Sequence, residues 1–361
     1  MLYQLMNKDT VVATYRERKD FDEYFYDEVE RLGSYLPYGF VDINDWIDGR
    51  QIAKHRNSIE RLMRELGLTT RHDFIGMVRC LSLTDTFWMK RDDEPLAWND
   101  VSLYRNPFDD VIARIAFDGT GMYGRANSPT SPEFATSGSF AKCWIREGDE
   151  ISLLKRGSSG YANAGFEPYS EVLAADLLKA AKVSHVPYSL MKFHGQLACK
   201  CPLFTSEKEG FVSAHRFFDR VFGVRDMLEF CSQHNAEESF REMIAMDAVM
   251  ANVDRHAGNY GFMVDNDTGE VLRMAPLFDH NMACLPMMME HDDFDWYLSM
   301  IGPKIGTGFI PIARELMTPQ IRAKLIGLKD FEYTDPGYDY PAWKLDAVNR
   351  LKNVQVDALL A

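Results

Sequence analysis

Residues 247–262 read DAVMANVDRHAGNYGF, and residues 275–281 read APLFDHN. Upstream of the first motif, apolar side chains recur at helical spacing between residues 240 and 250, which predicts an amphipathic helix. The apolar pattern then gives way to a polar loop. This loop contains Asp254, Arg255, His256 and Asn259.

A β-hairpin is predicted directly after this loop. Residues 260–264 and 270–274 have the composition of short strands, and the turn-forming residues DNDTG lie between them. The sequence therefore places a carboxylate and a carboxamide five residues apart, at Asp254 and Asn259, and then delivers a second carboxylate, Asp279, after the hairpin.

Phosphoryl transfer uses this set of side chains. In kinases an Asp orients the attacking hydroxyl, while an Asn and a second Asp hold Mg²⁺ on the phosphates. The separation of Asp254 and Asn259 matches that of the Asp and Asn in the protein-kinase catalytic loop, and Asp279 follows as a metal-binding Asp would. Asp and Asn also occupy turns for local hydrogen-bonding reasons, so a polar turn and a helix cap are the alternative interpretation.

The two motifs together resemble a known family. Residues 252–262 have the pattern N-x-D-R-H-x-x-N-x-G-F, and with A-P-L-F-D at 275–279 they resemble the catalytic and metal-binding segments of the HipA-like serine/threonine kinases. The D-R-H-x-x-N core is also similar to the catalytic loop of the phosphatidylinositol 3-/4-kinases. The resemblance covers roughly residues 130–360 and is specific around 247–281.

The resemblance implies a catalytic base at Asp254 and Mg²⁺ ligands at Asn259 and Asp279. It leaves His256 open, because lipid kinases use that His in catalysis whereas the protein-kinase logic relies on the Asp. It implies an α+β, bilobal protein-kinase-like fold with a β-rich small lobe at 131–206 and an α-rich large lobe at 207–361. Residues 1–130 would form an N-terminal extension for recognition or for structure.

Composition and charge limit the other possibilities. The chain has 54 acidic and 40 basic residues and a net charge of −14, which argues against direct binding of nucleic acid. No run of residues approaches the length of an apolar membrane span, and no secretory signal precedes the first motif. The six cysteines lack the spacing of a disulfide framework, so we expect a cytoplasmic protein with reduced thiols.

The N-terminal extension shows no catalytic cluster. We expect it to be mainly helical, with a strand over residues 1–15 followed by helices over 16–32, 56–66 and from 69 onward. Residues 82–90 have a strand-like, aromatic-rich pattern.

The predicted small lobe supplies the nucleotide-binding candidates. Ser137, Gly138 and Ser139 could form the turn that covers the phosphates, although a tight hairpin fits the same residues. The strand ending at Lys155 places its amine on the same face as two apolar side chains, as the phosphate-contacting lysine of kinases requires; a lysine reaching into water is the alternative. Glu171, with Glu167 as second choice, is the predicted partner of Lys155.

The nucleotide and the partners follow from the resemblance. Phe204 and Thr205 would belong to the hinge that contacts adenine. The resemblance implies ATP and Mg²⁺ as cofactors, a protein Ser or Thr as acceptor, and autophosphorylation at a serine, for which Ser137, Ser139, Ser158 and Ser159 are candidates. It also implies a small DNA-binding antitoxin as a possible partner. A lipid or small-molecule kinase, or a non-catalytic nucleotide-binding module, are the alternatives.

Overall fold

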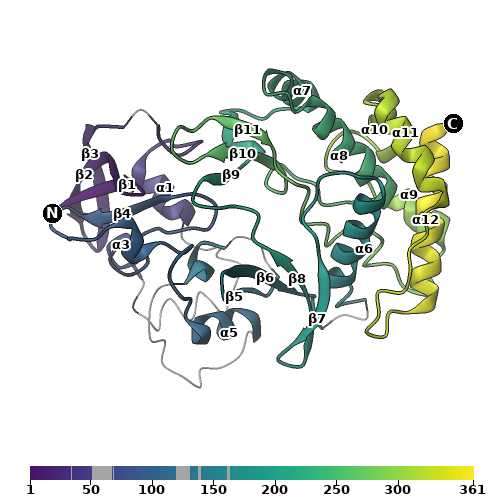
Figure 1. Ribbon diagram of the computed structural model, residues 1–361, viewed down its shortest axis with the longest axis horizontal. Helices are drawn as coiled ribbons and strands as arrows, with labels where there is room; N and C mark the ends of the chain where they lie inside the picture. The colour runs from purple at the N-terminus through teal and green to yellow at the C-terminus, as the bar shows by residue number, and fades with distance from the viewer. Residues whose placement is uncertain (34, 51–66, 68, 119–130, 137–139, 161–162) are drawn as a thin grey trace. The chain divides into compact units, whose positions relative to one another are not determined.

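The structure is a computed structural model that describes residues 1–33, 35–50, 67, 69–118, 131–136, 140–160 and 163–361 (Figure 1). The described chain forms two compact units. Unit 1 comprises Met1–Leu154, Leu203–Val212 and Met263–Val271, and unit 2 comprises Lys155–Pro202, Ser213–Phe262 and Leu272–Ala361. Both units are therefore discontinuous in sequence, so the predicted linear division into extension, small lobe and large lobe stays a prediction.

Unit 1 begins with a four-stranded sheet in the order β3-β2-β1-β4. Its strands are β1 (Leu2–Asn7), β2 (Thr10–Asp20), β3 (Glu23–Arg31) and β4 (Phe87–Arg91). β1 pairs with β2 and β4, and β2 pairs with β3, each time antiparallel. The central strand β1 buries Tyr3, Leu5 and Met6, which explains why the chain closes the sheet around it.

The predicted helix over residues 16–32 is wrong, and so is the expectation of a mainly helical extension. Asp20 pairs with Glu23 across a two-residue turn, and the whole segment forms the β2–β3 hairpin. Phe21, which the helical pattern counted as apolar face, lies at the turn with φ 52 and is 94% exposed. Arg18 crosses the hairpin to Asp27 at 3.2 Å and lies over the Phe25 ring.

Helices complete unit 1. They are α1 (Ile43–Arg50), α3 (Arg71–Val78), α4 (Trp98–Val101) and α5 (Asp110–Asp118), with a short 3-10 turn η1 (Pro132–Ala135). α3 fits the helix predicted from residue 69 onward, and it starts with a capping box between Thr70 and Asp73. The helix expected over 56–66 lies outside the described residues.

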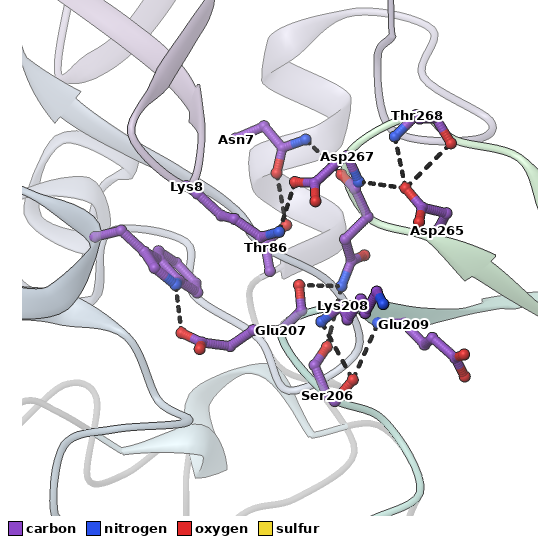
Figure 2. A network of polar contacts seen from close by, with 12 residues as sticks. Asn7, Lys8, Thr86, Ser206, Glu207, Lys208, Glu209, Asp265, Asp267 and Thr268 are labelled. Carbon is purple, nitrogen blue, oxygen red and sulfur yellow. Dashed lines mark hydrogen bonds and ion pairs between the residues drawn. The ribbon is translucent and has the colours of Figure 1, made fainter.

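Two segments from far along the chain pack against this N-terminal sheet (Figure 2). Asn7 donates to the Asn266 carbonyl at 2.6 Å and accepts from the Thr86 hydroxyl at 2.5 Å. The Asn266 side chain donates to the Ser206 carbonyl at 3.1 Å. Lys8 pairs with Asp267 at 2.5 Å. The segment around residue 266 is therefore bonded to the start of the chain, and Asn266 links it to the segment around residue 206.

The later strands include the hairpin that the sequence predicts after the polar loop. They are β5 (Lys142–Glu147), β6 (Glu150–Arg156), β7 (Ser189–Phe193), β8 (Gln196–Pro202), β9 (Glu209–Ser213), β10 (Gly261–Asp265) and β11 (Val271–Met274). Strand order is β5-β6-β8-β7 in one sheet and β11-β10-β9 in the other. The β7–β8 pair is antiparallel and turns at residues 194–195.

Unit 2 is mainly helical. Its helices are α6 (Glu167–Ala180), α7 (Val224–Gln233), α8 (Glu237–Met250), α9 (Phe294–Met300), α10 (Phe309–Glu315), α11 (Pro319–Gly327) and α12 (Ala342–Leu360). α8 is the central helix, in contact with α7, α10, α11 and α12 (Figure 1). Each of its residues from Met243 to Met250 is buried. Among the helices of the described residues, none combines the length and apolar character needed to cross a bilayer.

Candidate active site

The polar loop that follows α8 is shaped by its own side chains. α8 ends at Met250 because Ala251 adopts a left-handed conformation with φ 49. Asn252 then donates from its side chain to the Asp247 carboxylate at 2.9 Å and accepts the backbone N–H of Asp254 at 3.1 Å. The loop is thereby fixed to the last turn of the helix.

Arg255 is the structural centre of the site. Its guanidinium donates to both carboxylate oxygens of Asp247, at 2.8 and 3.1 Å, and to the backbone carbonyls of Asn259 at 2.7 Å and Phe278 at 2.8 Å. Its side chain is only 2% exposed. Burial opposes the charge, but Asp247 outweighs that cost and raises the pKa of Arg255. One buried cation therefore joins the loop to the segment that carries Asp279.

The three predicted site residues of the loop, Asn259, Asp254 and His256, make different contacts. The Asn259 side chain donates to the Asp254 carbonyl at 3.1 Å, which leaves its amide oxygen directed away from that bond. The Asp254 carboxylate pairs with Lys304, which lies between α9 and α10. His256 is exposed, and its Nδ1 accepts the backbone N–H of Gly258 at 3.0 Å.

A second charged group surrounds Lys155. The Lys155 ammonium lies 2.6 Å from the Glu171 carboxylate and 2.8 Å from the Asp279 carboxylate. The alternative in which the lysine reaches into water does not hold, because its side chain is 11% exposed. Glu171 rather than Glu167 is the partner, as first choice in the prediction. The second carboxylate oxygen of Glu171 accepts the backbone N–H of His280 at 2.7 Å.

The charges of Lys155, Glu171 and Asp279 act on one another strongly because Lys155 and Glu171 are buried. Burial works against the ammonium of Lys155, but Asp279 and Glu171 together raise its pKa well above the ordinary value. Burial raises the pKa of Glu171, with Lys155 opposing that effect and Asp279 adding to it. Lys155 is therefore a permanent cation between two acidic groups.

The backbone around Asp279 is held in place on several sides. Leu277 forms an isolated parallel bridge with His185. The Asp279 N–H donates to the Tyr188 hydroxyl at 3.3 Å, and Asp279 has φ 60, a conformation that Asp tolerates better than most side chains. This strained position is maintained by the packing around it.

The Met-rich stretch after Asp279, residues 282–289, is fixed by the C-terminal helix. Lys344 of α12 donates to the Pro286 carbonyl at 3.0 Å and the Met288 carbonyl at 2.7 Å, and it lies over the Phe166 ring at 4.1 Å. Burial lowers the pKa of Lys344 to about 8. The Met-rich stretch is thus bound to the buried Lys344 amine through the carbonyls of Pro286 and Met288.

Not every predicted residue is brought to this site. Ser137, Gly138 and Ser139 lie outside the described residues. Phe204 and Thr205 belong to unit 1, where the Phe204 ring contacts Phe211 edge-on and the buried Thr205 hydroxyl donates to the Leu83 carbonyl at 2.5 Å. Their proposed contact with adenine stays a prediction.

The available ligands fit one kind of metal. Within the described chain, no three His, Cys, Asp or Glu side chains gather that could hold a metal ion by themselves. Asn259 and Asp279 offer an amide oxygen and a carboxylate, hard donors that suit Mg²⁺ when substrate phosphates and water complete its shell. This donor set does not suit zinc, which prefers nitrogen and sulfur.

The structural contacts of two site residues, Arg255 and Lys304, are not predicted from the sequence. Arg255 was part of the motif but had no assigned role, and the only signal for it was Asp247, a carboxylate eight residues upstream on the buried side of α8. Lys304 gave no signal, because it is 50 residues away from Asp254 in the chain.

The fold that carries this site is similar to that of HipA. No family model matches the sequence, and no curated protein matches it. One solved structure that the chain resembles over its length is HipA of Shewanella oneidensis MR-1, solved with HipB and operator DNA; the match covers 99% of each chain with a TM-score of 0.55 and 11% sequence identity. The chain is also similar to the Helicobacter pylori proinflammatory kinase CtkA, with a TM-score of 0.45 and 14% identity over 61% of this chain and 92% of that one. The match to HipA confirms the HipA-like fold that the two motifs predict.

Proposed function

We propose that this protein transfers the γ-phosphoryl group of ATP, with Mg²⁺, to a Ser or Thr hydroxyl of a protein. The observation that carries the proposal is the buried Arg255, which bonds the carbonyls of Asn259 and Phe278. It fixes the two predicted metal-binding segments to one another through a single guanidinium. Phosphoryl transfer depends mainly on such positioning and on electrostatic stabilisation.

Each charged side chain has a role in this proposal. Asn259 and Asp279 would hold Mg²⁺, which when bound neutralises the charge that develops on the phosphates. Lys155 would contact phosphate oxygens, with Glu171 keeping the ammonium in position. Asp254 would accept the proton of the acceptor hydroxyl once its carboxylate leaves Lys304.

The proposal also covers the fold, autophosphorylation, the cellular compartment and the partner of the protein. We propose a bilobal kinase-like fold for this protein, as a cytoplasmic enzyme that phosphorylates itself on a serine. The six cysteines, all free and buried, support a reducing compartment. Because the similar HipA was solved with HipB and operator DNA, a small DNA-binding antitoxin is the partner that we propose.

The experiment compares the purified wild type with Asp254→Ala. Both are incubated with radiolabelled ATP, Mg²⁺ and a cell lysate, and label on the protein and on lysate proteins is counted. We expect Asp254→Ala to retain the fold and lose the label. The matched control is Asp295→Ala, which removes a surface carboxylate paired with Arg350 at 2.7 Å and should label as the wild type does.

Three results would contradict the proposal. Equal labelling by Asp254→Ala and the wild type would remove Asp254 as the base. A wild type that labels lipids but no protein would replace the protein acceptor with a lipid. A wild type that binds ATP without transferring label in Mg²⁺ or Mn²⁺ would be a binding module.

A further inference from the structure

One tyrosine contacts two of the charged residues of the candidate site. Tyr188 directly precedes β7 and belongs to unit 2, as do Lys155, Glu171 and Asp279. Its hydroxyl accepts the backbone N–H of Asp279 at 3.3 Å, and the Lys155 ammonium lies over its ring, 5.5 Å from the ring centroid. Two parts of one side chain therefore meet the predicted metal ligand and the predicted phosphate-contacting lysine.

The chain before Tyr188 runs alongside the segment that carries Asp279. Leu277 donates its backbone N–H to the Ser184 carbonyl at 2.9 Å, and the Leu277 carbonyl accepts the N–H of Val186 at 2.9 Å. The Tyr188 hydroxyl adds its bond two residues further along both segments. The two segments are therefore joined by two backbone bonds and, at their far end, by one side-chain bond.

Asp279 depends on this support because its backbone is left-handed. Its φ is 60, a conformation that a residue other than glycine keeps only when its surroundings determine it. The peptide before Asp279 is held through its N–H by Tyr188. The peptide after it is held through the His280 N–H, which donates to Glu171 at 2.7 Å. Both peptides that flank the Asp279 Cα are thus fixed, and with them the direction of its carboxylate.

The ring of Tyr188 acts on Lys155. A cation within about 6 Å of the centre of an aromatic ring is attracted by the face of that ring. The carboxylates of Glu171 and Asp279 attract the same ammonium, so the ring adds an uncharged third contact. Burial raises the pKa of Tyr188 well above its ordinary value, and Glu171 adds to this effect while Lys155 opposes it. The hydroxyl is therefore neutral and adds no negative charge to the group.

The position of Tyr188 is set by the adjoining sheet. Ser189 pairs with Lys200 in the antiparallel β7–β8 ladder, and one further step of that register brings Cys201 opposite Tyr188. The buried Cys201 thiol interacts with the Tyr188 side chain. Pro187 restricts the backbone just before the tyrosine. Tyr188 thus projects from a rigid element, as a residue that orients others requires.

We propose that Tyr188 is the positioning residue for both parts of the metal and nucleotide site. Its hydroxyl sets the backbone of Asp279 and so the direction of that carboxylate, and its ring sets the ammonium of Lys155. The inference rests on the proposed function, because it concerns the residues that would hold Mg²⁺ and phosphate. The hydroxyl and the ring act through different residues, so substitution separates their effects.

Two substitutions make this separation. Tyr188→Phe removes the hydroxyl and keeps the ring, whereas Tyr188→Leu removes both. The matched control is Tyr169→Phe, which also removes a hydroxyl bonded to the backbone of unit 2, in this case to the Tyr338 carbonyl.

Three measurements are made on each protein. Hydrogen exchange of the Asp279 amide is followed in overlapping peptides without nucleotide. Binding of a fluorescent ATP analogue is titrated in EDTA and then at increasing Mg²⁺ concentration. Urea midpoints report the stability of each variant.

We expect the Asp279 amide of Tyr188→Phe to exchange about fivefold faster, because a hydrogen bond of ordinary net strength is lost. The half-saturating Mg²⁺ concentration should rise by a similar factor, while the affinity in EDTA stays that of the wild type. Tyr188→Leu should show both changes and should also bind the analogue about two- to fivefold more weakly in EDTA, since Lys155 loses the ring. Tyr169→Phe should match the wild type in exchange and in binding.

Unchanged exchange at Asp279, or an unchanged Mg²⁺ requirement, in Tyr188→Phe would overturn the role of the hydroxyl. A lower urea midpoint with wild-type Mg²⁺ dependence would show that the tyrosine is merely structural. Equal affinity of Tyr188→Leu and the wild type in EDTA would overturn the role of the ring. The same changes in Tyr169→Phe would indicate a general loosening of unit 2 and overturn both roles.

Failure of the proposed function gives a different result. A wild type that binds no nucleotide would remove the kinase proposal and, with it, the role of Tyr188 toward metal and phosphate. Faster exchange of the Asp279 amide in Tyr188→Phe would then still show that the hydroxyl holds this residue.

Discussion

Removing the Arg255 guanidinium is the change that most directly tests how this site is held together. Arg255→Met keeps a long, apolar side chain but leaves the Asp247 carboxylate without its partner, in a position only 6% exposed. Breaking a buried ion pair from one side costs about 3–5 kcal/mol. The carbonyls of Asn259 and Phe278 also lose their donor, at about 1 kcal/mol or more each.

The expected loss is therefore about 5 kcal/mol or more, a large part of the stability of a typical domain. It is measured as the shift in urea midpoint, at constant slope, with circular dichroism as the signal. Asp247→Asn in the same background removes the unpaired charge while its amide oxygen can still accept from Asn252. The double variant should regain about 2–3 kcal/mol, because the penalty for the buried charge disappears. It should not regain phosphoryl transfer, because the two carbonyls remain unbonded.

A urea midpoint for Arg255→Met within about 1 kcal/mol of the wild type would refute the reasoning. So would a double variant no more stable than the single one. Arg255→Lys is the conservative control: it keeps the charge but not the bidentate bonds, so we expect an intermediate loss.

Four further outcomes follow from other contacts. Glu171→Gln should lower the rate of transfer about a hundredfold with little change in fold, since Lys155 loses one of its two carboxylates; initial rates with saturating ATP measure this. Asp279→Ala should lose Mg²⁺-dependent ATP binding, and unchanged affinity by calorimetry would exclude its metal role. The pKa of Lys344 falls from 10.5 to about 8 on folding, so below about pH 8 the folded protein must carry a buried charge. Wild-type stability relative to Lys344→Met should thus rise by about 3 kcal/mol between about pH 8 and 10.5, and urea midpoints independent of pH would contradict this. Asn7→Ala should cost about 1–3 kcal/mol because two buried hydrogen bonds are lost, and a midpoint equal to that of the wild type would show that water replaces them.

The local part of the site could be predicted because its signals are local. The spacing of Asp254 and Asn259, the end of α8 and the β10–β11 hairpin all depend on residues close together in the chain. Lys155 and Glu171 could be paired because a strand and the following helix fix their direction. Roles on the metal and the phosphates remain predictions, since they concern groups that the chain itself does not contain.

The contacts that sequence could not give are those between distant segments. The β2–β3 hairpin was interpreted as a helix because Phe21, Tyr24, Val29 and Leu32 fit a helical stripe as well as they fit a strand. Pairing across the hairpin itself decided the conformation, because residues 16–20 pair with residues 23–27 and of residues 16–32 only Arg16 pairs with β1. In the same way Lys304 reaches Asp254 only through the folded path of the chain between them.

The network of Asn7, Thr86 and Asn266 has a practical consequence for anyone who divides this protein into pieces. A truncated chain that starts near residue 131 would still contain the segments around 206 and 266 and the bond between them, but it would lack the Asn7 side chain that donates to the Asn266 carbonyl. Polar groups now shielded by the first strand would meet solvent, and the apolar surface beside them would invite aggregation. Expression of a shortened chain should therefore supply residues 1–118 as a separate, co-expressed polypeptide rather than omit them.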